Sequence, residues 1–187
     1  LHIAPDQTAA GLGLNRIDPT FRRVVGMGMA ALEEYMPGYQ AQVFSGYRGG
    51  QGQAAHAART GGAMDIQIVD PDGNTIPHRG QDTTGLYTLF AQMIYSIAQV
   101  EAPDMIGGQG YGARGLNWGG SFNPGFGGSN VFDLEHWDFS GIRGQNTHNL
   151  LANLPPFIYG ETRPEQAPEY NPAAQYHVGA GYNLLGP

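Results

Sequence analysis

The stretch FDLEHWDF, residues 132–139, places several side chains that bind metals or move protons among aromatic residues. They are Asp133, Glu135, His136 and Asp138. Charged groups beside aromatic rings are costly to bury unless they are paired or bound to a cation. In an extended strand Asp133 and His136 would lie on opposite faces. If both serve one site, a turn or bulge must lie between them.

A second candidate group lies in HAARTGGAMDIQIV, residues 56–69. His56 precedes Asp65 by nine positions, and Asp65 opens an apolar strand in which an unpaired carboxylate is unfavourable. If the glycine turn between them folds back, both side chains converge on one point, as metal ligands from a loop and an adjacent strand would. The alternative is an ordinary turn in which Asp65 accepts backbone hydrogen bonds.

These two groups together match the needs of zinc catalysis. Catalytic zinc takes three protein ligands and keeps an open position, and a nearby carboxylate accepts the proton of the attacking water. His56, Asp65 and His136 would fill the ligand set, and either Asp133 or Glu135 would serve as the base. The competing interpretation, a solvated acidic loop beside a packed tryptophan, explains the acids but not the histidine among them.

A third element is SGYRGG, residues 45–50, which follows an expected strand. Arg48 lies between glycines that would let a substrate approach closely. Its guanidinium would hold a substrate carboxylate or a developing oxyanion there.

Composition narrows the class of protein. The chain has 187 residues, 41% hydrophobic and 13% charged, which is enough for one folded domain with a core. Its net charge of -7 argues against nucleic acid as a partner. The absence of cysteine excludes disulfides and thiolate zinc sites. No apolar stretch is long enough for a membrane span.

The elements that must position these residues follow from caps and periodicity. Asp18 and Pro19 begin a helix that Pro37-Gly38 ends, and Asp82 caps a second helix over 82–102. Strands are expected at 41–46, from 62 to 69 with a return after a turn at 70–74, near 113–118 and at 130–140. This order predicts an α+β fold with a small antiparallel or mixed sheet.

The turn DPDGN, residues 70–74, also resembles the start of a calcium loop. The later glutamate that such a loop requires is absent, so we interpret it as a hairpin turn. We expect a lead-in segment at 1–17, a domain at 18–153 and a proline-rich extended arm at 154–187. The arm contains tyrosines among its prolines and is a candidate for binding a protein partner.

Four motifs of this chain occur in the order found in VanY-like zinc peptidases. They are SGYR, the histidine before GGAMD, NWGG and DLEHW. The chain resembles that superfamily over about residues 40–140. The VanY-like superfamily includes D-alanyl-D-alanine carboxypeptidases, D-Ala-D-Ala dipeptidases and phage endolysins that cut L-alanyl-D-glutamate bonds. The resemblance implies a Hedgehog/D-Ala-D-Ala-peptidase-like fold, with helices packed on one side of the sheet.

The resemblance also implies roles for individual residues. His56, Asp65 and His136 would bind Zn²⁺, Asp133 rather than Glu135 would be the base, and Arg48 would stabilise the polarised carbonyl. Trp118, Gly119 and Gly120 would shape the wall of the cleft, with Trp137 beneath the site and with Glu135 and Asp138 orienting ligands.

The expected function is therefore zinc-dependent hydrolysis of peptidoglycan stem peptides. The negative charge and the proline-rich end suggest a phage virion component that opens the cell wall, with a secreted or periplasmic enzyme as the other setting. The alternative is a catalytically inactive structural or binding module with the same fold. Its motivation is the interval from His56 to Asp65, which is longer than the family's usual one.

Overall fold

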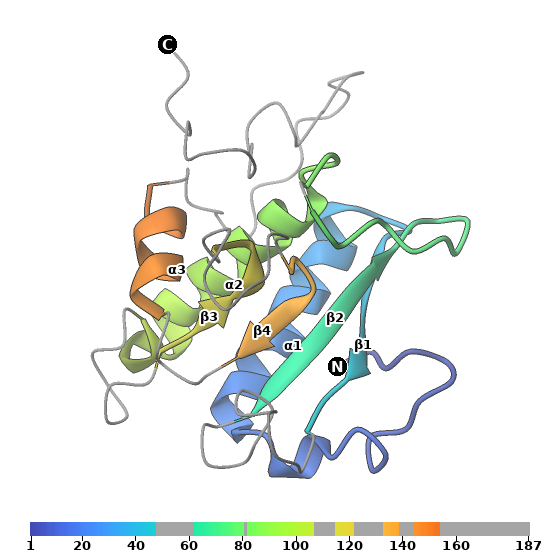
Figure 1. Ribbon diagram of the computed structural model, residues 1–187, viewed down its shortest axis with the longest axis horizontal. Helices are drawn as coiled ribbons and strands as arrows, with labels where there is room; N and C mark the ends of the chain where they lie inside the picture. The colour runs from blue at the N-terminus through green and yellow to red at the C-terminus, as the bar shows by residue number, and fades with distance from the viewer. Residues whose placement is uncertain (48–61, 81, 107–114, 122–132, 139–143, 154–187) are drawn as a thin grey trace.

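A four-stranded antiparallel sheet forms the centre of the computed structural model, which describes residues 1–47, 62–80, 82–106, 115–121, 133–138 and 144–153 (Figure 1). The strands are β1 (Gln40–Ser45), β2 (Ala63–Val69), β3 (Asn117–Trp118) and β4 (His136–Asp138), in the order β1-β2-β4-β3. The helices are α1 (Pro19–Tyr35), α2 (Leu86–Glu101) and α3 (Gly144–Leu151). Short 3₁₀ helices are η1 (Leu14–Arg16), η4 (Pro103–Met105) and η5 (Gly119–Ser121). The predicted α+β class is confirmed.

Helix α1 begins where its cap predicts. Asp18 Oδ1 accepts hydrogen bonds from the backbone N–H groups of Thr20 at 2.8 Å and Phe21 at 3.0 Å, and Pro19 occupies the first turn. These bonds satisfy N–H groups that have no partner within the helix. The helix ends before Pro37-Gly38, as predicted.

Helix α2 is tied to Asp82, which is 2% exposed. Its Oδ1 accepts from Gly85 N at 2.9 Å, and its Oδ2 accepts from both the backbone N and the hydroxyl of Thr88 at 2.8 Å. Regular helix starts only at Leu86, because Gly85 has a left-handed backbone with φ 71°. Asp82 was predicted to cap this helix; Gly85 occupies the N-cap position instead, while Asp82 accepts the Thr88 N–H from outside the helix, and the helix starts later than the predicted range.

Helices α1 and α2 lie side by side on one face of the sheet (Figure 1). The face of β2 that meets them consists of Met64, Ile66 and Ile68, all fully buried. On β4, Trp137 stacks on Trp118 of β3, with ring centroids 6.1 Å apart and planes inclined by 23°. The opposite face of β2 and β4 is therefore the one available for polar side chains.

The predicted turn at 70–74 is present. Asp70 Oδ1 accepts from Asp72 N at 3.0 Å and from Asn74 N at 2.8 Å. The return is shorter than predicted and consists of one antiparallel bridge, between Val69 and Thr75.

The chain following this turn is held in place by α2. The Tyr87 hydroxyl accepts from Ile68 N at 3.0 Å and donates to Ile76 O at 3.2 Å. These two hydrogen bonds hold the start of segment 76–79 beside β2. Burial of the Tyr87 hydroxyl raises its pKa above the usual range.

The expected lead-in segment packs onto the rest of the domain. Within the expected lead-in segment 1–17, Leu12, Leu14 and Ile17 are buried in the main core. Ile3 forms a parallel bridge with Val43 of β1. Helix α3 was not predicted, and the expected arm at 154–187 lies outside the described residues. Among the helices that the structure describes, none combines the length and apolar character needed to cross a bilayer.

Candidate metal centre

Asp65 and His136 face each other across the two central strands. They are directly opposed in the β2–β4 ladder, and His136 Nδ1 lies 3.0 Å from Asp65 Oδ1. Directly opposed residues project from the same face of a sheet. Both side chains are nearly buried, with 10% of His136 and 9% of Asp65 exposed. The strand pairing therefore joins two residues that the sequence separates widely.

Ser45 extends this row onto β1. The β1–β2 register shifts between Val43 and Ser45, and after that irregularity Ser45 stands opposite Asp65. A β-bulge of this kind re-aims side chains next to a site. The polar row on this face is thus Ser45, Asp65 and His136, across three neighbouring strands.

A turn brings Asp133 back toward His136. His136 N donates to Asp133 O at 3.1 Å, and Leu134 and Glu135 form the turn between them. This is the turn that the spacing in DLEHW required. In the part of the chain that is described, Asp133 Oδ1 is buried and has no hydrogen-bond partner. A buried carboxylate oxygen without a donor is unfavourable unless it serves a ligand, a proton or a cation.

The NWGG motif supports the turn from the neighbouring strand. The indole Nε1 of Trp118 donates to Leu134 O at 2.9 Å. Gly119 passes so close to Asp133 that a Cβ atom at this position would overlap the Asp133 carbonyl oxygen. Only glycine fits there. Helix α3 braces the same strand, because Thr147 Oγ1 accepts from Trp118 N at 2.9 Å.

A second polar group lies beside the turn, and sequence reasoning did not assign it. Arg79 forms an antiparallel bridge with Asp133, and Leu134 N donates to His78 O at 3.0 Å. His78 Nδ1 contacts Glu135 Oε2, and Arg79 Nη2 lies 3.6 Å from Glu135 Oε1. The Glu135 side chain is 5% exposed.

Within the described ranges, one group of at least three potential metal-binding side chains has its ligand atoms within 4.8 Å of one another: His78, Asp133 and Glu135. Burial, followed by the charge of Arg79, lowers the pKa of His78, and the carboxylates of Asp133 and Asp65 oppose that shift. Glu135 was expected to orient ligands, whereas His78 has no neighbouring motif in the sequence. His78 reaches this cluster because the segment that contains it pairs with the turn before β4, through the bridge between Arg79 and Asp133.

Two predicted site residues are not placed. Arg48 and His56 lie outside the described residues. For Asp138 the structure describes the backbone, which pairs with Ala63 and Asn117. The structure thus brings together Asp65, His136 and the turn of Asp133, while the third predicted ligand and the predicted arginine remain predictions.

The described donors fit a zinc ion. Two ligand atoms that share a tetrahedral zinc at about 2.0–2.1 Å lie roughly 3.3 Å from each other. Asp65 and His136 form a hydrogen bond of 3.0 Å, and a shift of a few tenths of an ångström would bring these two atoms to that spacing. One carboxylate oxygen and one imidazole nitrogen are common zinc ligands, and Asp133 Oδ1 is a buried acceptor in the turn that leads into β4.

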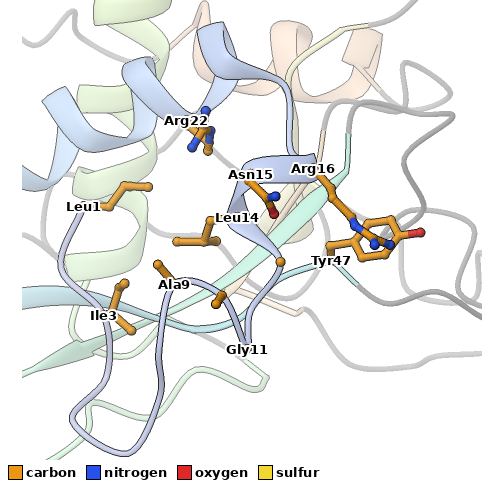
Figure 2. Close-up of a pocket in the computed structure, with 11 residues that line it drawn as sticks. Leu1, Ile3, Ala9, Gly11, Leu14, Asn15, Arg16, Arg22 and Tyr47 are labelled. Carbon is orange, nitrogen blue, oxygen red and sulfur yellow. The ribbon is translucent and has the colours of Figure 1, made fainter.

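A pocket of about 760 Å³ opens between the N-terminal segment, α1 and the end of β1 (Figure 2). Its lining includes Arg16, Arg22 and Tyr47. The Arg16 guanidinium lies 4.8 Å from the centre of the Tyr47 ring. Arg22 Nε is buried and makes no hydrogen bond within the described residues. The pocket is suited to an anionic group, and Tyr47 directly precedes the predicted Arg48.

No protein-family model, curated protein or solved structure matches this chain.

Proposed function

We propose that this chain is a zinc-dependent peptidoglycan peptidase that hydrolyses amide bonds of stem peptides, with a Hedgehog/D-Ala-D-Ala-peptidase-like fold. The observation that supports it best is the opposed pair Asp65 and His136, with Asp133 one turn away and its Oδ1 buried. Their types and order along the chain are those of the VanY-like peptidases.

Asp65 and His136 would hold the metal together with His56. The central position of β2 and β4 suits this task, because Asp65 is paired with Ser45 on one side and with His136 on the other, and β4 is held at its other edge by β3. When bound, zinc supplies a Lewis acid that polarises the amide carbonyl and makes water a stronger acid.

Asp133 would accept the proton of the attacking water and pass it to the leaving amine. Its Oδ1 makes no hydrogen bond to the described part of the protein, so a proton or water can engage it without breaking an existing bond. The turn anchored by Trp118 and Gly119 fixes where that oxygen lies. Arg48 would face the carbonyl oxygen of the substrate.

The setting we propose is a phage virion component acting on the bacterial wall. The net charge of -7 does not favour binding to an anionic wall by electrostatic attraction alone. Attachment to a larger assembly, with the segment 154–187 as the contact, would hold the enzyme at its substrate.

The test is digestion of purified peptidoglycan by the zinc-loaded chain, with products identified by mass spectrometry. We expect stem-peptide fragments whose release stops with a chelator and with His136→Ala. His2→Ala is the matched control, because His2 also pairs with a carboxylate, Glu33, but on the surface. If folded, zinc-loaded protein releases nothing from several wall types, the enzymatic proposal is wrong. The inactive structural module would then be favoured.

A further inference from the structure

The cluster of His78, Asp133 and Glu135 is chemically separate from the Asp65–His136 pair, although the two meet at the same turn. Its three ligand atoms come from a loop after β2 and from the turn before β4, and they lie within 4.8 Å of one another. Small side-chain rotations would bring them to the roughly 3.3 Å spacing of ligands on one tetrahedral ion. One nitrogen and two oxygens form a donor set that zinc and related divalent ions accept.

Two further observations point to a cation at this cluster. Glu135 is 95% buried by side-chain area, since 5% is exposed, yet its Oε2 accepts no hydrogen bond in the described part of the chain and lies against His78 Nδ1. His78 Nδ1 also makes no hydrogen bond there, and neither does the buried Asp133 Oδ1. Two carboxylate oxygens are thus brought together with an imidazole nitrogen, which is an electron-pair donor when His78 carries its proton on Nε2, and this donor set favours a cation among them.

Besides His78, Arg79 is the basic side chain found near Glu135 among the described residues, with its Nη2 at 3.6 Å from Oε1. Its side chain is 70% exposed, so its guanidinium is mostly solvated and can turn away into water. An exposed arginine at that distance compensates the buried carboxylate only weakly. It therefore competes with a cation at the cluster without excluding one.

We infer that His78, Asp133 and Glu135 form a second divalent-cation site, and that zinc bound there inhibits the enzyme by engaging Asp133. The inhibitory part rests on the proposed function, in which Asp133 is the base. A carboxylate that ligates a cation no longer accepts a proton, so one residue cannot serve both sites at once. Zinc would activate at its first equivalent and inhibit at its second.

The site itself is tested without substrate, by equilibrium dialysis of the full chain against Zn²⁺. We expect the wild-type protein to bind a second equivalent of zinc that His78→Ala lacks, whereas His136→Ala loses the other equivalent. His2→Ala serves as the matched control, since it removes a surface histidine that pairs with a glutamate and should leave the stoichiometry unchanged. If His78→Ala does not fold by circular dichroism, Glu135→Gln replaces it, because the amide keeps the shape and removes the charge.

Inhibition is tested by measuring the rate of wall digestion as zinc is added. The rate of each variant is compared with the rate of the same variant at one equivalent of zinc. The wild-type rate should fall by roughly 10²-fold at excess zinc, the lower end of what a lost general base costs. The rate of His78→Ala should stay level over the same range. Arg79→Gln should shift inhibition to lower zinc, because it removes the competing charge.

Equal stoichiometry in the wild type and His78→Ala would overturn the second site. Equal inhibition of both by excess zinc would overturn its inhibitory role. The outcome for the proposed function is separate. A second equivalent that depends on His78, in a protein that never digests wall material, would support the cation site and reject the peptidase.

Discussion

Two histidine–glutamate contacts in this chain share the same chemistry but differ in their surroundings. His2 Nε2 lies 3.1 Å from Glu33 Oε2, with 44% and 36% of the side chains exposed. His78 contacts Glu135 with 28% and 5% exposed. Water solvates both members of the first pair, whose net contribution to stability is small. In the second pair a carboxylate has lost its water, so it depends on its neighbours.

In the Asp65–His136 pair both members are shielded from water, with each side chain about one-tenth exposed. It lies on the two central strands, whereas His2 lies near the N-terminus, outside the helices and strands. The difference indicates that burial in a rigid setting separates a histidine–carboxylate site from an ordinary surface contact.

The strongest test of that distinction is removal of the buried pair. Asp65→Ala or His136→Ala should reduce wall digestion to background and remove tightly bound zinc, because each variant deletes a ligand. Digestion assays and zinc content after gel filtration would measure this. Retention of full activity by either folded variant would contradict the assignment of the metal centre.

Asp133→Asn should have the next largest effect. The amide keeps the size of the side chain but cannot accept the proton, so kcat should fall by about 10²–10⁴-fold. Zinc content at the first site should stay close to that of the wild type, which separates the base from the ligands. A comparable loss in Glu135→Gln at one equivalent of zinc, with Asp133→Asn active, would instead identify Glu135 as the base.

Gly119→Ala should disturb the turn that positions these carboxylates. Its Cβ would overlap the Asp133 carbonyl oxygen, so we expect a loss of about 1–3 kcal/mol in the free energy of unfolding. Gly26→Ala is the control, since a Cβ in that helical position meets only ordinary contacts at 3.8 Å and should be neutral or slightly stabilising. Chemical denaturation of both variants measures this difference, and an equal stability of the two would contradict it.

His2→Ala should have the smallest effect. Loss of an exposed pair should cost about 0–1 kcal/mol of stability and leave digestion unchanged. Thermal melts and the same digestion assay check this. A large change at His2 would mean that exposure does not separate surface contacts from sites in this chain.

Much of the framework could be predicted because its determinants are local. Asp18 with Pro19, Asp82 and the turn at Asp70 each act through backbone groups a few residues away. The apolar run after Asp65 likewise predicted the strand that became β2. The spacing of Asp133 and His136 was enough to require the turn that is present.

The cluster around His78 could not be predicted in this way. Its contact with Glu135 arises because a loop fastened by Tyr87 crosses the turn before β4, and no spacing in the sequence encodes that crossing. Helix α3 was missed because its sequence, GQNTHNLL, is only eight residues long with two apolar side chains, and such a short helix depends on contacts such as that of Thr147 with Trp118.

The position of β4 between β2 and β3 has a consequence for the order of folding. Asp65 and His136 are 71 residues apart in sequence, so their pairing closes a long loop that includes α2 and β3. Long-range strand pairing is slow, and a growing chain cannot complete it before β4 has left the ribosome. Both tryptophans of the protein stack beside this junction. Their fluorescence should therefore change in the same late kinetic phase in which the chain first becomes able to retain zinc.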